Sequence, residues 1–262
     1  MLTSGIFLRK TLKAARIARL IKNFPAVYSH LILGSRLHGI RLRNGIEISA
    51  GQDVDLWRLF HDIWLSEIYT RKHNPIQPGS IVFDIGASVG VFTIFAGALG
   101  GYVYSYEPSP SSFRSLLKNV QSKPGLQIRT FPFALSGRRE WRVLHEFPKS
   151  TGNSFFCEQG NVIGEVRETQ VECRTLADIF DDNSVRQCDF LKLNCEGAEF
   201  EILFSTPQTS FSRIKALAVE CHDRLTDCTH TDLKHYLDNL GYSTSISLVR
   251  KDGTAILLAR QD

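Results

Sequence analysis

Short apolar segments that alternate with helix-length segments constrain this sequence more than any other feature. Ile81-Val82-Phe83 contains no polar residue, as expected of a strand that is buried on both faces of a parallel sheet. Further short strands are predicted at 102–106, 126–133, 190–193 and 216–219, and helices at 88–99, 110–121 and about 229–240. This alternation favours a parallel sheet with right-handed crossovers and helices on both faces.

Two closing strands complete the predicted sheet. They are expected at about 243–249 and 254–259, joined at Asp252-Gly253, and they bring the sheet to seven strands. Residues 137–168 break the alternation with a polar stretch, which we interpret as an insertion or lid. The predicted fold class is therefore α/β, Rossmann-like, with a mostly parallel seven-stranded sheet.

The residues before this sheet have a different character and predict a helical and hairpin extension. Pro75 and Pro78-Gly79 mark the boundary, so we predict an extension at 1–74 and a ligand-binding domain at 75–262. Within the extension, residues 6–34 favour one or two amphipathic helices divided by Pro25, Asn44-Gly45 predicts a hairpin, and 53–70 predicts a helix packed on the main body.

Positive charge is concentrated at the N-terminus, although the formal net charge is only +4. No acid precedes Glu47, whereas the basic residues of this region are Arg9, Lys10, Lys13, Arg16, Arg19, Lys22, Arg36, Arg41 and Arg43. A solvated helix face is the first interpretation, and peripheral contact with an anionic membrane is the alternative. Because the acid-free basic region is confined to this end, a nucleic-acid partner is not expected.

The cysteines and apolar runs favour a cytoplasmic protein with reduced thiols. None of the 6 cysteines forms a C-x-x-C pair, so the usual zinc spacing is absent. No secretory segment is recognisable near Met1, and no apolar run approaches the roughly 20 residues of a membrane span.

A glycine bend follows the first strand in Asp84-Ile85-Gly86-Ala87-Ser88-Val89-Gly90. Its glycines permit a sharp turn, and the amides at the following helix start favour an anionic group. The spacing is D-x-G-x-x-x-G rather than the G-x-G-x-x-G of dinucleotide sites, and Asp84 would repel a pyrophosphate. An acid suits a cationic amine and sulfonium instead. S-adenosylmethionine (SAM) is thus the predicted ligand, at Asp84, Gly86, Ser88 and Gly90.

Glu107-Pro108 ends the second strand, where a carboxylate can accept both hydroxyls of a ribose. NAD enzymes use an acid in the same way, so this feature indicates a nucleoside without identifying it. A nicotinamide oxidoreductase remains an alternative, which the glycine spacing and Asp84 disfavour.

Polar residues also follow the fourth and fifth parallel strands. Asn194 is placed beside the cofactor, and His222 is the predicted general base, with Glu196 or Glu220 as the alternative base. Glu199 and Glu201 are interpreted as acids that favour the dipole of the next helix. A divalent metal held by Asn194, Glu196 and Glu220 is a further alternative, and we assign no metal ligand.

At these motifs the sequence resembles the FkbM methyltransferase family. The resemblance runs from about residue 40 to about 225 and rests on residues 82–90, Tyr106-Glu107-Pro108-Ser109-Pro110 and Leu191 to Glu199. It implies a class I SAM-dependent methyltransferase fold and O-methylation of sugars, polyketides or other secondary metabolites. The family commonly has Asn where this chain has Ser88, and Asp where it has Asn194, which cannot act as a base.

The predicted function is therefore methyl transfer from SAM to a hydroxyl of a small-molecule or glycan acceptor. A nucleic-acid methyltransferase is an alternative, but its amino-group versions need an Asn/Asp-Pro-Pro-aromatic step, and this chain has Asn194-Cys195-Glu196-Gly197. A second alternative is a non-catalytic scaffold that binds a partner through its N-terminal helices. The sequence indicates no oligomeric state.

Overall fold

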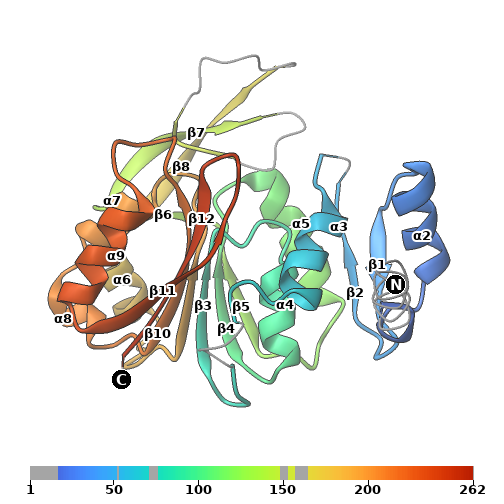
Figure 1. The fold of residues 1–262 in the computed structure, drawn as a ribbon, viewed down its shortest axis with the longest axis horizontal. Helices are drawn as coiled ribbons and strands as arrows, with labels where there is room; N and C mark the ends of the chain where they lie inside the picture. The colour runs from blue at the N-terminus through green and yellow to red at the C-terminus, as the bar shows by residue number, and fades with distance from the viewer. Residues whose placement is uncertain (1–16, 52, 71–75, 148–152, 157–164, 262) are drawn as a thin grey trace, which may run out of the picture.

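A seven-stranded sheet forms the centre of the protein in the computed structural model, which describes residues 17–51, 53–70, 76–147, 153–156 and 165–261. Its order is β11-β12-β10-β9-β3-β4-β5 (Figure 1). The strands are β3 (Ile81–Ile85), β4 (Tyr102–Tyr106), β5 (Ile128–Phe131), β9 (Phe190–Leu193), β10 (Ala216–His222), β11 (Tyr242–Val249) and β12 (Thr254–Gln261). Neighbouring strands are parallel except that β12 is antiparallel to both β10 and β11. The predicted Rossmann-like sheet is confirmed.

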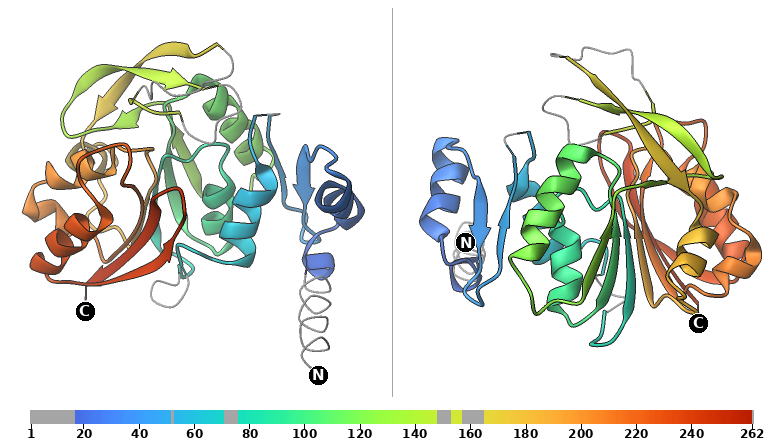
Figure 2. Two further views of the ribbon diagram at one scale, coloured as in Figure 1. Left: turned by 45° about the horizontal axis from the view of Figure 1, so that its top comes forward. Right: turned by 180° about the vertical axis from the view of Figure 1, so that it is seen from behind.

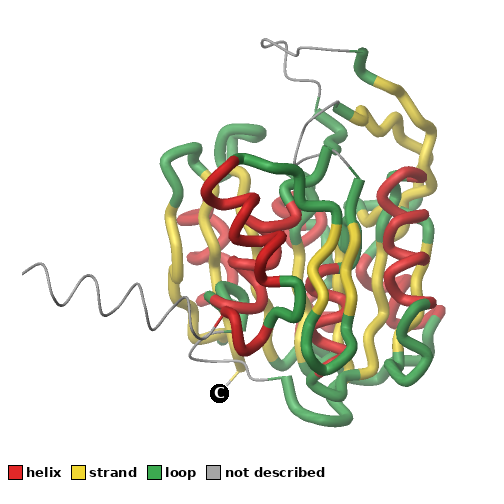
Figure 3. The backbone as a smooth tube through the Cα atoms, turned by 90° about the vertical axis from the view of Figure 1, so that its right-hand side faces the viewer, coloured by secondary structure: helices red, strands yellow, loops and turns green. Residues whose placement is uncertain are grey.

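Helices cover both faces of the sheet (Figure 3) because its central strands are apolar on both sides. Phe83 packs into one core with α6 (Leu176–Asp182), α7 (Glu199–Phe204), α8 (Gln208–Phe211) and α9 (His230–Asn239). Val82 faces the opposite core, which contains α4 (Val91–Ala98). The remaining helix of the predicted alternation, α5 (Pro110–Gln121), has its predicted bounds and is capped by Ser109.

The N-terminal extension shares the second core with the sheet. It consists of α2 (Phe24–Leu33), a hairpin of β1 (Gly39–Arg41) and β2 (Glu47–Ser49), and α3 (Leu56–Phe60), which continues as the π-helical turn η1 (His61–Leu65). The helix predicted at 53–70 is therefore shorter than expected. Pro25 lies in the first turn of α2, where its missing N–H costs nothing. The predicted helical region before residue 17 lies outside the described residues.

A small second sheet lies in the sequence between β5 and β9, where an insertion was predicted. It is built from β6 (Ala134–Leu135), β7 (Glu140–Glu146) and β8 (Arg167–Arg174), and β7 and β8 extend beyond the main sheet (Figure 2). Arg142 of β7 bonds Glu201 of α7 at 2.8 Å, which fastens the insertion to the sheet's helical layer. In the described part of the chain, no helix has the length and apolar character needed to cross a membrane.

Close contact between two loops fixes the bend after β3. Gly86 has φ +75°, and a Cβ at this position would lie 1.7 Å from the carbonyl oxygen of Asn194. No side chain can be accommodated there unless one of the two backbones moves. The bend that follows β3 and the loop that follows β9 are therefore held against each other.

We predict that Gly86→Ala lowers the free energy of unfolding by at least about 3 kcal/mol, because it adds left-handed strain to a backbone clash. Urea denaturation measures this change. Gly125→Ala is the matched control, since its Cβ would meet nothing within 4 Å. Equal stability of the two variants would contradict the described contact.

Candidate active site

A cavity of about 1140 Å³, including its open part, lies at the carboxyl ends of the central strands. Three parts of the chain form its walls: the edge of the sheet, the β6–β8 insertion and the N-terminal extension. The predicted site residues that line it are Gly86, Ser88, Glu107, Asn194, Glu196 and Glu220. Asp84, Gly90 and His222 are not among its lining residues.

Asp84 lies beneath the bend rather than in the cavity. Its side chain is fully buried, accepts a hydrogen bond from Thr93 Oγ1 at 2.6 Å, and forms an ion pair with Lys192 Nζ at 3.1 Å. Asp84 and Lys192 are neighbours in the β3–β9 register. The expectation that Asp84 meets a cationic ligand is therefore corrected, because its charge is already paired on the α4 side of the sheet.

Lys192 is a site residue that the sequence analysis missed. Besides pairing with Asp84, its ammonium donates to the Gly86 carbonyl oxygen at 2.7 Å. It therefore holds the glycine bend from below. The sequence did contain a signal for this residue, namely a lysine inside an otherwise apolar strand. A buried charge requires a partner, so such a lysine indicates an ion pair.

Glu107 connects the bend to the end of β4. Its two carboxylate oxygens accept hydrogen bonds from the Ser88 amide at 2.7 Å and from the Ser109 amide at 2.9 Å. Burial raises the pKa of Glu107 to about 7, although both amides act to lower it. Ser88 itself stands at φ +52°. Gly90 has a packing role, since a Cβ there would lie 2.6 Å from Leu116 Cδ1.

Glu220 belongs to a polar network that joins the extension to the sheet. It accepts hydrogen bonds from Tyr69 Oη, from Asn194 Nδ2 at 3.1 Å and from Arg250 Nη1 at 2.5 Å. Arg250 also pairs with Asp62 at 2.9 Å. Burial acts to raise the pKa of Glu220, but Arg250 and Tyr69 hold it below its ordinary value. This stable carboxylate is a poor proton acceptor, so the structure does not support Glu220 as the base.

The network leaves the side-chain oxygen of Asn194 without a hydrogen-bond donor among the described residues. Its amide nitrogen is engaged by Glu220, whereas Oδ1 is buried and has no hydrogen-bond partner within the described residues. Asn194 lines the cavity. Its oxygen is therefore available to a hydrogen-bond donor on a bound ligand.

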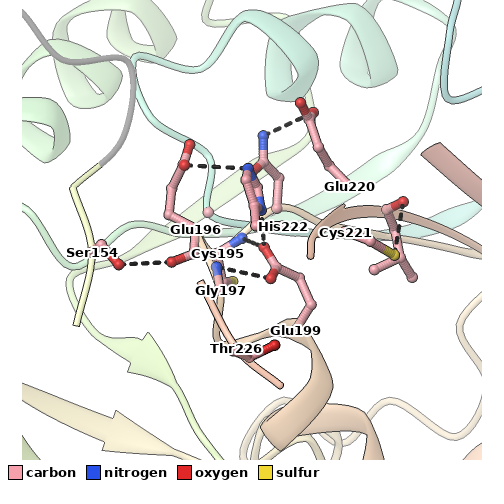
Figure 4. Close-up of polar contacts among 12 residues, drawn as sticks. Ser154, Cys195, Glu196, Gly197, Glu199, Glu220, Cys221, His222 and Thr226 are labelled. Carbon is pink, nitrogen blue, oxygen red and sulfur yellow. Dashed lines mark hydrogen bonds and ion pairs between the residues drawn. The ribbon is translucent and has the colours of Figure 1, made fainter. Parts of the chain in front are cut away.

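His222 lies between two carboxylates (Figure 4). Its Nδ1 is 3.0 Å from Glu199 Oε1, and its Nε2 is 3.2 Å from Glu196 Oε2. Burial acts to lower the pKa of His222, but Glu199, Glu196 and Glu220 raise it to about 10. At neutral pH the ring is an imidazolium, so it cannot accept a proton. The prediction of His222 as general base is therefore not supported.

Glu199 has a larger role than the predicted helix-dipole effect. It is fully buried and accepts hydrogen bonds from the Cys195 amide at 2.6 Å and the Gly197 amide at 2.9 Å. Together with its bond to His222, these contacts set the shape of the loop after β9 (Figure 4). The sequence alone could not reveal the contact, because it joins residues that lie 23 positions apart.

Glu196 presents a carboxylate to the cavity. Its backbone is left-handed at φ +50°, and its carbonyl oxygen accepts a hydrogen bond from Ser154 Oγ of the insertion at 2.7 Å. Burial, with Glu199 and Glu220, raises the pKa of Glu196 to about 7, while His222 opposes the shift. A carboxyl group that titrates near neutrality at a cavity wall can act as a general base.

The extension contributes cavity residues that sequence reasoning assigned to no site. Arg58, Asp62 and Tyr69 line the cavity, while Phe60 and Trp64 of the same segment pack in the core. Core packing was predicted for Phe60 and Trp64. The polar face carried no recognisable motif, so its contact with β10 was not predictable.

Neither a metal cluster nor a thiolate stands out in the described residues. No group of three or more His, Cys, Asp or Glu side chains there has an arrangement that could hold a metal ion. Cys195 lines the cavity, but burial, with the charge of Glu199, raises the pKa of its thiol well above the ordinary value. A protonated thiol is a poor nucleophile.

Comparisons with known proteins found a matching family profile, similar sequences and similar structures. The family profile described as “Methyltransferase FkbM domain” matches residues 84–244. The chain is 25% identical over 211 residues to the 31-O-demethyl-FK506 methyltransferase FkbM of Streptomyces tacrolimicus, covering 70% of this chain and 81% of that protein. It is 21% identical over 217 residues to Methyltransferase 1 of Beauveria bassiana, covering 75% and 82%. A precorrin-6y C5,15-methyltransferase structure from Geobacter metallireducens aligns with TM-score 0.48 and 14% identity, covering 82% and 94%.

We predict that Lys192→Met lowers the free energy of unfolding by about 3–5 kcal/mol, because it leaves the Asp84 carboxylate buried and unpaired. The double variant Asp84→Asn/Lys192→Met should recover part of the loss. Lys215→Met, which removes a lysine that is 52% exposed, is the control in the same denaturation experiment. A loss at position 192 as small as that of the control would show that the pair is not needed.

Proposed function

Since this chain belongs to the FkbM methyltransferase family, we propose that it transfers the methyl group of SAM to a hydroxyl oxygen of a sugar, polyketide or related small acceptor. That it is a SAM-dependent methyltransferase follows from the family. The observation that carries the finer proposal is Glu196, a carboxylate at the cavity wall whose pKa is raised to about 7. The name of the Streptomyces relative refers to an O-demethyl acceptor, which also favours oxygen.

The residues around the bend fit SAM. The cavity lies outside the carboxyl ends of the strands, where open α/β sheets bind their ligands. Glu107 is positioned to accept the ribose hydroxyls, and the unsatisfied Oδ1 of Asn194 is a buried acceptor suited to an ammonium. Gly86 and Ser88 also line the cavity. When bound, SAM supplies an electrophilic methyl group on a sulfonium.

Glu196 takes the acceptor's proton in this proposal. Deprotonation as the carbon–oxygen bond forms contributes about 100- to 10,000-fold to the rate. His222 is a positioning residue: its imidazolium holds the Glu196 carboxylate in place and is itself held by Glu199. Leu144 and Phe155 of the insertion contribute apolar side chains to the cavity wall.

Glu107→Gln should weaken SAM binding by about tenfold or more, because an amide accepts fewer hydrogen bonds than a carboxylate. Isothermal titration calorimetry measures the dissociation constant. Because the pKa of Glu107 is about 7, more of it is ionised at pH 8 than at pH 6. Wild-type affinity should therefore rise over this range and that of Glu107→Gln should not. Unchanged affinity in the variant would remove Glu107 from the cofactor site.

Acceptors are found by screening sugars and polyketides with methyl-labelled SAM, each paired with its deoxy analogue. We expect label only where the hydroxyl is present. With such an acceptor, turnover should rise with pH through about 7, because the base must be ionised. Glu196→Gln should lose about 100-fold or more in turnover and lose the rise. His222→Gln removes a cation that lowers the pKa of Glu196, so its profile should shift to higher pH.

Glu172→Gln is the control, since this β8 carboxylate is not among the residues that line the cavity. Label on nitrogen or carbon would refute O-methylation whatever the variants do. Labelling of oxygen with full activity in Glu196→Gln would refute only the assignment of the base.

A further inference from the structure

Helix α2 exposes several large apolar side chains, whereas its polar residues Ser29 and His30 are half-buried. Tyr28, Leu31 and Ile32, here called the α2 face, are between 46% and 63% exposed, and Leu33 at the end of the helix is 77% exposed. A surface helix normally has the opposite pattern, with its apolar stripe towards the core. Leu31 and Ile32 lie three and four residues after Tyr28, so these three side chains share one side of the helix rather than being scattered apolar positions.

The polar residues of α2 contact the turn that follows the helix. Ser29 Oγ accepts a hydrogen bond from Ser35 Oγ at 2.9 Å, and His30 Nδ1 lies 2.6 Å from the Ser35 carbonyl oxygen. Val27 is fully buried and anchors the helix to the extension's core. Burial of Val27 turns the opposite side of α2, with the α2 face, towards solvent.

We propose that the α2 face docks on an anionic membrane surface. Lys22 precedes α2 and Arg36 follows it, both at exposed positions, and no acid precedes Glu47 in the whole sequence. Interfacial membrane binding needs two signals together, an inserted apolar face and basic residues around it. The N-terminal region supplies both.

Charge argues against a second copy of the chain as the occupant. Pairing two α2 faces would bring the basic ends of both helices together, where like charges repel. Anionic lipid headgroups attract the same residues instead. No residue of α2 lines the cavity, and α2 lies at the outer side of the hairpin (Figure 1). Docking through α2 therefore leaves the active site accessible.

Vesicle sedimentation with the full chain tests the proposal. Vesicles of phosphatidylcholine with about 30% phosphatidylserine should bind the protein, and pure phosphatidylcholine should bind it at least about tenfold more weakly. Leu31→Gln/Ile32→Gln should reduce partitioning to the anionic vesicles by about tenfold, because it removes the apolar anchor. Lys22→Glu and high salt should each weaken binding as well.

Val249→Gln, which removes an apolar side chain that is 59% exposed on β11, is the matched control and should bind like the wild type. Calorimetric affinity for SAM should be the same in all variants, which verifies that they fold. The proposal is overturned if anionic vesicles do not bind the protein, or if Leu31→Gln/Ile32→Gln binds them normally. It is also overturned if the protein is a dimer that this double variant dissociates, because the α2 face would then be a contact between copies.

Discussion

Lys192 and Asp84 form an ion pair that is almost completely enclosed between β9, β3 and the glycine bend, and the shape of the bend depends on it. Burying either charge alone would be costly, so the two strands must keep the register that brings them together. The same ammonium bonds the Gly86 carbonyl oxygen. The position of the bend, and with it the contact between Ser88 and Glu107, thus follows from a pair that does not itself touch the cavity.

Neighbouring charges give the three carboxylates around His222 different chemistry, although all three are glutamates. Arg250 holds the pKa of Glu220 below its ordinary value, Glu199 accepts hydrogen bonds from two amides and contacts the His222 ring, and burial raises the pKa of Glu196 at the cavity wall to about 7. Enzymes commonly give identical side chains different pKa values through their surroundings, so that each side chain can take a different role in the same site. The loop after β9 links Glu196 and Glu199, because Glu196 belongs to this loop and Glu199 accepts hydrogen bonds from two of its amides.

The sheet and the bend were predictable because their signals are local. Apolar runs at strand length, helical spacing and a glycine pattern each occupy a few consecutive residues. The direction of Asp84 was not predicted, because it depends on pairing with Lys192, which is more than 100 positions away in the sequence. The contact of Tyr69 with Glu220 joins residues 151 positions apart, and no motif marks either end. For the same reason the behaviour of His222 could be inferred only once both flanking carboxylates were located.

Two non-glycine residues of the cavity, Ser88 and Glu196, have left-handed backbones, at φ +52° and +50°. Such a conformation costs a residue with a Cβ on the order of 1 kcal/mol, a strain that glycine does not carry. Glycine at either position would therefore make the fold more tolerant of heat while removing a side chain from the cavity. At Glu196, the base in our proposal, such a gain would remove the carboxylate, so a laboratory search for hardier variants is better directed to other parts of the chain.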